Sequence, residues 1–396
     1  MKITVLGDIM CEPSVLKAAK TGDGSYSFDE IFEPVKAMLA ASDYVIGNLE
    51  FPLAGEAAGY SNSYYDFNAP DVYADAVKRA GIDLVSTINN HTLDRGVDGM
   101  LRTLSVLDAA GVAHTGNFRS YEEREEAFYF TLGETKFALV AYTYTTNKKI
   151  PADDPYIGSM NLLRPLRAPT YLPAVAKKMK TWVDRMFPKM NPEKRGRIKK
   201  LVGLPGTIAR ADDYLDKEAC APFMEQFVSD IRAAKEKADV VIAYPHVGGQ
   251  FNPEPGEFSK YTVEKALAAG ADVVLASHSH MLQPASVDNG IPVVYSLGNF
   301  NMSSSSTIVL KKHLPDYGVA LHLYYDGAKL TRVTFTLLKA VEKRGEQMVT
   351  YPVHLLYNTL ARARDKKKLL AEAETAYRFF TGKELPAGEL CEEYEL

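Results

Sequence analysis

The sequence of 396 residues is poor in cysteine and has no long apolar run. Its three cysteines, Cys11, Cys220 and Cys391, lie far apart without CxxC spacing and cannot form a framework of disulfide bridges. No stretch of about 18 apolar residues occurs, and the opening MKITVLGDIM reaches a charged residue too early for a signal peptide. We therefore expect no transmembrane segment and a cytoplasmic location as written, or an extracellular or membrane-anchored one if a leader has been removed.

An excess of either charge is also missing. Lys and Arg number 46 against 50 Asp and Glu, so that the net charge is −4. Hydrophobic residues make up 46% and charged residues 24%, as in ordinary soluble globular proteins. This balance gives no reason to expect a nucleic-acid partner.

The first third of the sequence alternates short apolar runs with longer helical patterns, which predicts βαβ units and a mainly parallel sheet. Hairpins are expected at AFYFTLGETKFALVAYTYT, PASVDNGIPVVYSLGNF and YGVALHLYYDGAKLTRVTFTLLKAV. A Lys- and Arg-rich stretch interrupts the rhythm as an insertion at about 147–215. A charged helix is expected near 353–380. We predict one domain over 1–340, which includes the insertion, and a C-terminal helical extension over 341–396.

Polar side chains follow the carboxyl ends of five expected strands. Ligands of open α/β sheets bind beyond these ends, so the side chains should converge at one edge. They are Asp8, Asn48, Glu50, Asn89, Asn90, His91, His246, His278 and His280. The two last histidines would point to the same side if the extended geometry continues. Carboxylate, amide and imidazole ligands together suit Zn, Mn or Fe, so we expect one or two divalent ions that activate a water and polarise a phosphoryl or carbonyl oxygen.

Six ordered motifs, GDIM, GNLE, NNHTLDRG, HVGGQ, AGADVVLASHSHMLQP and PVVYSLGNF, resemble the bacterial capsule synthesis protein family CapA, also called PgsA. That family is linked to poly-γ-glutamate and has a calcineurin-like metallophosphoesterase fold. The resemblance spans roughly residues 1 to 305 and implies a four-layered α/β/β/α sandwich.

The resemblance also implies roles for individual residues. Asp8 and His280 would hold one metal, Glu50 would bridge, and Asn90, His246 and His278 would complete a second site. His91 would be the general acid and Asp94 would orient its ring. Asn48, Asn89 and Asn299 are weaker candidates for substrate contacts, and Asn299 could instead shape a turn.

Several positions depart from the family pattern. Met10 stands where the DxH histidine belongs, which removes one ligand from the first metal and predicts a weak or empty site. Glu50 replaces an aspartate and lengthens the bridging arm. Val247, Gln250, Phe251 and Ser277 also differ, which bears on substrate contacts more than on the metal ligands.

Simpler interpretations compete for single residues. Asp8 could cap a helix, Asn89–His91 could form a turn, and His246 could be a core histidine. Their common position at strand ends favours a site. The basic insertion is by default a solvated helix face, with a lid, a membrane-surface helix or a polyanion groove as alternatives.

Three functions remain open from the sequence. The first is a metal-dependent hydrolase-like protein that makes, exports or trims an anionic polymer such as poly-γ-glutamate, with capsule synthesis or export proteins as partners. The second is a small-molecule phosphatase or phosphodiesterase acting on a phosphoester. The third is a non-catalytic polyanion-binding scaffold of a capsule-export complex.

Overall fold

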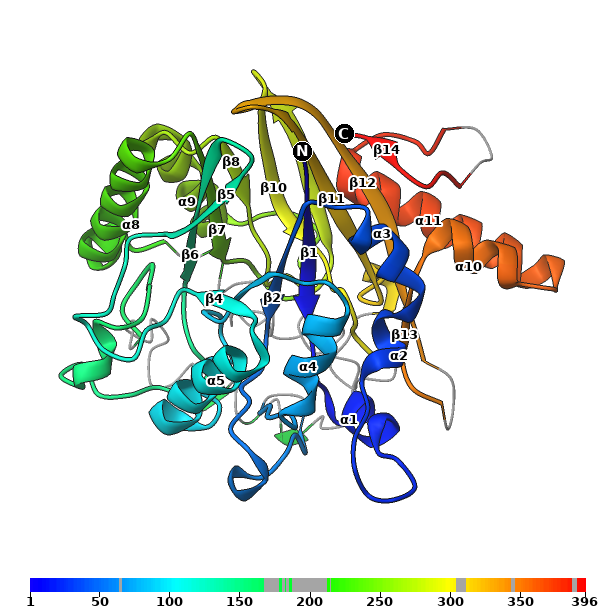
Figure 1. The fold of residues 1–396 in the computed structure, drawn as a ribbon, viewed down its shortest axis with the longest axis horizontal. Helices are drawn as coiled ribbons and strands as arrows, with labels where there is room; N and C mark the ends of the chain where they lie inside the picture. The colour runs from blue at the N-terminus through cyan, green and yellow to red at the C-terminus, as the bar shows by residue number, and fades with distance from the viewer. Residues whose placement is uncertain are drawn as a thin grey trace.

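A computed structural model describes residues 1–63, 66–166, 178–179, 182, 185–186, 212–213, 215–303, 311–342, 346–386 and 390–396. Two mixed sheets are stacked face to face, and helices cover the outside of each (Figure 1). Most of the insertion expected at 147–215 lies outside the described residues.

The first sheet has the order β13-β12-β11-β1-β2-β3-β4, and β14 pairs with β12. Its neighbours β1 to β4 run parallel, as the βαβ rhythm predicts, whereas β1 and β11 are antiparallel. The strands are β1 (Lys2–Ile9), β2 (Tyr44–Leu49), β3 (Leu84–Ser86), β4 (Ala113–Thr115), β11 (Tyr317–Asp326), β12 (Lys329–Val341), β13 (Val349–Pro352) and β14 (Tyr394–Glu395).

The second sheet has the order β5-β6-β7-β8-β10-β9. The strands β6, β7, β8 and β10 are parallel neighbours, and β5/β6 and β9/β10 are hairpins at the predicted places, as is β11/β12 in the first sheet. The strands are β5 (Phe128–Leu132), β6 (Thr135–Thr143), β7 (Val240–His246), β8 (Val273–Leu275), β9 (Leu282–Asp288) and β10 (Ile291–Leu297).

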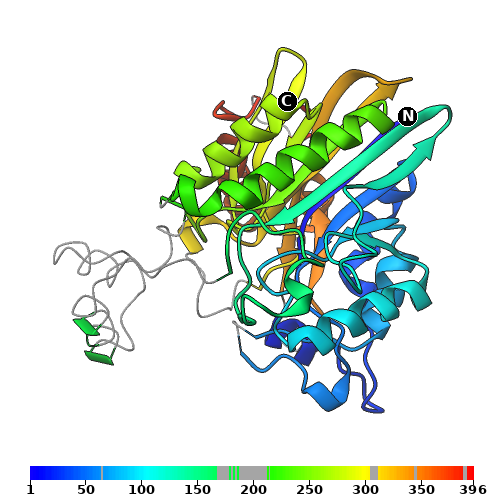
Figure 2. The same ribbon diagram turned by 90° about the vertical axis from the view of Figure 1, so that its left-hand side faces the viewer.

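Helices cover both outer faces. The helices α8 (Lys217–Lys237) and α9 (Glu257–Ala269) lie side by side on the second sheet (Figure 2). The first sheet is covered by α1 (Pro13–Ala19), α2 (Asp29–Phe32), α3 (Lys36–Ala40), α4 (Val72–Arg79) and α5 (Gly96–Ala110). Short 3-10 turns occur at η1 (Glu33–Val35), η2 (Glu56–Ala58), η3 (Pro155–Ile157) and η5 (Lys311–His313).

The largest apolar core lies between the two sheets. It joins Val5 and Ile46 of the first sheet to Leu139 and Ile242 of the second, and all four side chains are fully buried. Separate clusters fill the spaces between each sheet and its helices. The layers therefore follow the order α/β/β/α, which confirms the predicted four-layered sandwich.

The C-terminal region belongs to the same sandwich. The charged helix expected over 353–380 is two helices, α10 (Val353–Thr359) and α11 (Ala363–Thr381), separated by a break at Leu360–Arg362. Leu369, Ala373 and Phe380 of α11 join the core between the sheets. The boundary near residue 340 stays a prediction. Among the described residues, no helix has both the length and the apolar character needed to cross a membrane.

A close backbone contact joins the two sheets beside β1. The backbone N–H of Asp8 donates to Gly298 O at 3.1 Å, and Phe300 N–H donates to Asp8 O at 2.8 Å. A Cβ atom at Gly7 would lie 2.2 Å from Gly298 O, so only glycine allows this approach. The end of β10 is thereby fixed next to the end of β1.

Candidate metal centre

The structure brings the predicted polar residues together at one edge of the two sheets. Asp8 and Glu50 come from the ends of β1 and β2 in the first sheet. His246 ends β7, and His278 and His280 follow β8 in the second sheet. All five are at most 2% exposed. Buried groups of this kind are stable only with compensating partners, which directs attention to the atoms they face.

Four ligand atoms face one another around a common point. His246 Nε2 lies 3.1 Å from His278 Nδ1 and 2.7 Å from Asn90 Oδ1, and His278 Nδ1 lies 3.1 Å from the same oxygen. Glu50 Oε1 lies 3.6 Å from His246 Nε2. Ligands about 2.0–2.1 Å from a tetrahedral Zn²⁺ lie about 3.3–3.4 Å apart. The four atoms therefore have the spacing of a tetrahedral metal site.

A second set shares the same carboxylate. Asp8, Glu50 and His280 offer ligand atoms that all lie within 4.8 Å of one another. His280 Nε2 is 3.6 Å from Glu50 Oε1, and its Nδ1 is 2.9 Å from Asn299 Oδ1. An outer partner of this kind fixes the orientation of a ligand imidazole. Glu50 thus lies where a carboxylate could bridge two cations.

The electrostatics of the site fit a divalent cation. Within the described part of the chain, neither carboxylate oxygen of Glu50 accepts a hydrogen bond although both are buried. Burial and the charge of Asp8 raise the pKa of Glu50 well above its ordinary value. Burial and neighbouring imidazoles lower the pKa of His246 and His278 well below theirs. Neutral imidazoles beside unpaired carboxylates are what a cation requires, and the nitrogen and oxygen set suits Zn, Mn or Fe.

Met10 belongs to an apolar cluster between the first sheet and its helices, together with Cys11 and Phe300. Asn301 fixes its backbone, because the Asn301 Oδ1 accepts from Met10 N at 2.8 Å and Nδ2 donates to Met10 O at 2.9 Å. The first set therefore has three candidate protein ligands where the DxH pattern would supply a fourth.

His91 lies beside the ligands with its ring fixed on two sides. Its Nδ1 is 2.5 Å from Asp94 Oδ2, and the ring stacks on Phe67 at 4.1 Å between centroids. The Nε2 atom is 4.0 Å from Glu50 Oε1. The placement agrees with the expected roles of His91 as an acid and Asp94 as its orienting partner, which stay predictions.

The three weaker candidates contact the ligands. Asn48 Nδ2 donates to Asp8 Oδ1 at 2.8 Å, and Asn89 Nδ2 donates to Asn48 Oδ1 at 3.1 Å. Asn299 contacts His280, and its Nδ2 donates to Pro315 O at 2.7 Å. These amides orient Asp8 and His280, and their expected contacts with substrate stay a prediction.

The backbone of the HSH motif differs from the extended geometry considered above. His278 has φ of 109° and His280 has φ of 55°, so β8 does not continue through them. Positive φ is unfavourable for residues other than glycine and recurs at functional sites. Both imidazoles reach the centre because the chain turns there, and strand alternation plays no part.

Tyr144 was not among the sequence candidates. It follows β6, and its hydroxyl lies 2.8 Å from His278 Nε2, the nitrogen that faces away from Asn90. Asn147 in the same segment places Nδ2 3.4 Å from both ring nitrogens of His91. The strand-end rule would have found this segment if it had been applied to the second strand of the predicted hairpin.

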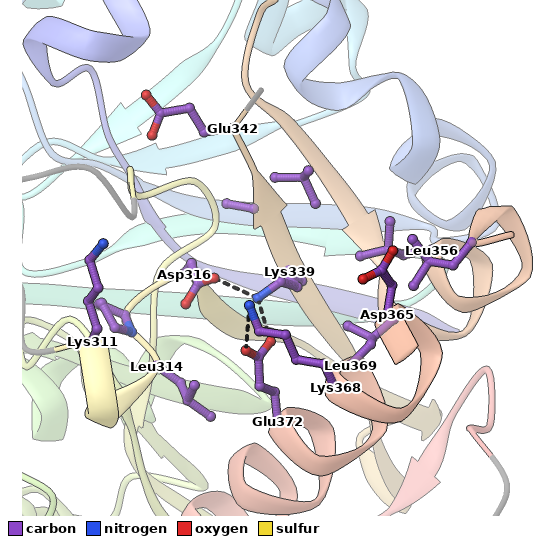
Figure 3. A pocket seen from close by; sticks show the side chains of 14 residues that line it. Lys311, Leu314, Asp316, Lys339, Glu342, Leu356, Asp365, Lys368, Leu369 and Glu372 are labelled. Atoms are coloured by element: carbon purple, nitrogen blue, oxygen red, sulfur yellow. Dashed lines mark hydrogen bonds and ion pairs between the residues drawn. The ribbon is translucent and has the colours of Figure 1, made fainter. Parts of the chain in front are cut away.

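A separate cavity of about 480 Å³ lies between the β10–β11 connection, the end of β12 and α11. Lys339 crosses it and binds Asp316 Oδ2 at 2.6 Å and Glu372 Oε2 at 3.1 Å (Figure 3). None of the predicted ligands lines this cavity. It is therefore distinct from the metal centre.

Comparisons with known proteins agree with the motif resemblance. A family model described as bacterial capsule synthesis protein PGA_cap matches residues 2–304. The capsule biosynthesis protein CapA of Bacillus anthracis is 23% identical over 81% of this chain and 66% of its own length. The CapA protein of Bacillus subtilis, described as a PGA biosynthesis protein, is 24% identical over 84% of this chain and 70% of its own length. An uncharacterized protein of Sinorhizobium fredii is 26% identical over 75% of this chain, and the match spans 65% of that relative's length.

Two solved structures also show similarity. A hypothetical protein from Thermus thermophilus has a TM-score of 0.42 and 15% identity, with 85% of this chain and 98% of that chain covered. A putative 5'-nucleotidase from Staphylococcus aureus has a TM-score of 0.43 and 13% identity, with 94% of this chain and 58% of that chain covered.

Proposed function

We propose, since the chain belongs to the bacterial capsule synthesis protein family PGA_cap, that it is a metal-dependent hydrolase that acts on an anionic capsule polymer such as poly-γ-glutamate. The reaction would be cleavage of a phosphoester or a γ-glutamyl amide during synthesis, export or trimming of the polymer. Its partners would be capsule synthesis and export proteins.

One observation carries the proposal. Glu50, Asn90, His246 and His278 direct four ligand atoms to one point, and the buried Glu50 oxygens accept no hydrogen bond from the described residues. Such an arrangement is costly unless a cation is bound. A purely structural role would be expected to pair the carboxylate with hydrogen-bond donors.

The ligand residues define where the chemistry would occur. When bound, a divalent ion lowers the pKa of a water and polarises the scissile group. Glu50 would join the two ligand sets, while Asn48 and Asn299 keep Asp8 and His280 in orientation. These contacts preorganise the ligands before substrate arrives.

His91 would supply the proton that the leaving group needs. Asp94 accepts the Nδ1 proton, so the second proton of an imidazolium would sit on Nε2, on the side of Glu50. Stacking on Phe67 holds the ring in that orientation. Transfer of the Nε2 proton to the leaving oxygen or nitrogen would complete the cleavage.

The first test is the metal-to-protein ratio, measured by elemental analysis after purification without chelator. The parent should bind Mn, Zn or Fe, and a variant with His278→Ala and His280→Ala should lose it. His114→Ala is the matched control, because His114 contacts Asp108 away from the centre. A parent without metal, even after supplementation with Mn or Zn, would contradict the proposal.

Activity assays then define the substrate. Nitrophenyl phosphoesters and poly-γ-glutamate are to be tested with the metal-loaded parent and with His91→Ala. Turnover of the polymer supports the proposed role, whereas turnover of the phosphoesters alone would favour a small-molecule phosphatase.

The position of Met10 favours a second candidate function. With only three ligands in the set around Asp8, the protein would be a non-catalytic scaffold that binds the anionic polymer. Polymer binding retained in His91→Ala, with no turnover by either protein, would support the scaffold.

A further inference from the structure

The segment that follows β6 runs directly over the candidate metal centre. The Tyr144 hydroxyl contacts His278, and the Asn147 backbone N–H donates to Asn90 O at 2.6 Å. Lys148 Nζ donates to the carbonyl oxygen of Asp94. Contacts with three separate parts of the centre fix this segment in place, and any charged groups that it carries are held at the edge of the site.

Arg164 packs against the same segment. Its Nε donates to Tyr144 O at 2.9 Å, and its guanidinium carbon lies 4.5 Å from the centre of the Tyr144 ring and 5.3 Å from that of Phe258. Aromatic contacts of this kind fix the plane of a guanidinium. Within the described ranges, neither terminal nitrogen of Arg164 forms a hydrogen bond or ion pair. Its fork is therefore oriented and available to an anion.

Lys149 adds a second positive charge. The residue is exposed overall, but its ammonium group turns inward to Thr145 Oγ1 and Thr146 O. This partial burial and the charge of Arg164 lower the pKa of Lys149 to about 8. No carboxylate pairs with Lys149 among the residues the structure describes. In that part of the chain, two neighbouring cations thus lack a counter-charge.

Other lysines in the molecule show what compensation looks like. Lys339 in the separate cavity lies between Asp316 and Glu372 (Figure 3). Lys148, next to Lys149, pairs with Asp66 at 3.1 Å. Asp212, whose charge acts on Tyr144, is already engaged by Gly256 N–H and by Ser259. The missing counter-charge at Arg164 and Lys149 is therefore local to the edge of the metal centre.

We propose that Arg164 and Lys149 form an anion subsite that binds a phosphate or carboxylate group of the substrate next to the metal ligands. The subsite rests on the proposed function for its role in substrate binding. Arginine binds planar or tetrahedral oxyanions through two parallel hydrogen bonds, and lysine acts as a point charge. Tyr144 connects the subsite to the ligand His278, because it contacts both this histidine and Arg164.

Isothermal titration of the intact protein as purified tests the subsite with two probes. Inorganic phosphate represents a phosphoester, and a linear trimer of γ-linked glutamate represents the polymer. We expect Arg164→Gln and Lys149→Gln each to weaken binding of the preferred probe by about tenfold to a hundredfold, the typical worth of a hydrogen bond to a charged group. Arg164→Lys should recover only part of the loss, because lysine lacks the planar fork.

Controls separate this inference from the proposed function. Arg378→Gln removes an exposed arginine of α11 and should leave binding unchanged. The metal content of every variant is measured in parallel and should equal that of the parent, since neither Arg164 nor Lys149 is a ligand. If Arg164→Gln fails to fold, Arg164→Lys and Lys149→Gln keep the test decisive.

The outcomes are distinct. Unchanged affinity in Arg164→Gln and Lys149→Gln, with metal retained, would overturn the subsite and leave the hydrolase proposal standing. Failure of both probes to bind the parent would also overturn the subsite. A parent without metal whose anion binding still depends on Arg164 would support the subsite and contradict the hydrolase. A loss confined to phosphate or to the trimer identifies the group that is recognised.

Discussion

Asp94 and His91 form a pair in which the carboxylate fixes both the position and the proton of the ring. Asp94 Oδ2 lies 2.5 Å from His91 Nδ1 and also accepts from Phe67 N–H at 2.7 Å. The backbone contact anchors the carboxylate, and the carboxylate keeps a proton on Nδ1. Any proton that His91 gives to a substrate must therefore leave from Nε2.

The pair predicts two different losses of activity. His91→Ala removes the proton donor and should lower kcat by about a hundredfold to ten-thousandfold, the usual range for a general acid. Asp94→Asn keeps the ring but no longer holds the Nδ1 proton, so kcat should also fall and its pH profile should shift. Metal content should stay at the parent level in both variants. Loss of metal in His91→Ala would instead make His91 a ligand.

Removal of the metal should destabilise the protein. Asp8 and Glu50 are buried next to each other, and a cation that binds only the folded state adds stability with its concentration. We expect a chelator to lower Tm by several degrees, consistent with about 3–4 kcal/mol at saturating metal. In Glu50→Gln the repulsion and the shared ligand are both gone, so Tm should respond little to chelator. An equal response in parent and variant would contradict a metal held by Glu50.

Restoring the DxH histidine should not restore a metal ligand. In Met10→His a polar ring would replace a side chain within the apolar cluster of Cys11 and Phe300. Burial of an unpaired polar group there should lower the free energy of unfolding by about 1–3 kcal/mol. The metal-to-protein ratio should stay as in the parent. A higher ratio in Met10→His, measured by elemental analysis, would show that position 10 reaches the centre.

His322 predicts acid sensitivity away from the centre. Burial and the charge of Lys2 lower its pKa to about 3 from 6.5, so the folded state keeps the ring neutral. As pH falls below 6.5 the unfolded chain gains a proton that the folded chain does not, and stability decreases until pH reaches the folded-state pKa. The loss should be about 2 kcal/mol at pH 5.

His322→Gln is the comparison for this prediction. The ring contacts Thr4 Oγ1 at 2.8 Å and Thr336 Oγ1 at 3.0 Å, which an amide can also bond. Urea unfolding of both proteins at about pH 7 and pH 5 should give a smaller decrease for the variant. Parallel decreases would assign the acid sensitivity to other groups.

Much of the fold was predictable because its signals are local. The β5/β6 hairpin and the parallel β1–β2–β3–β4 order follow from turn residues and alternating runs. The predicted ligands converge because each follows a parallel strand, whose carboxyl end faces the same edge. The break between α10 and α11 at Leu360–Arg362 escaped prediction, since its sequence carries neither proline nor glycine.

The surroundings of the centre were harder to predict because they depend on contacts between distant segments. Tyr144 and Arg164 are common residue types in a region without a motif, and only the packing of β6 beside β7 brings them to His278. The positive φ angles of His278 and His280 depend on tertiary contacts, and local residue preferences do not favour them.

The distribution of ligands along the chain has a consequence for assembly. Asp8 and Glu50 belong to one sheet and His246, His278 and His280 to the other, so the nearest ligands of a cation are separated by up to about two thirds of the chain. Contacts of such separation form late in folding, because the chain entropy must first be overcome. A cation therefore cannot nucleate this fold, and it binds only after the two sheets have docked. Metal release would then report separation of the sheets before either sheet unfolds.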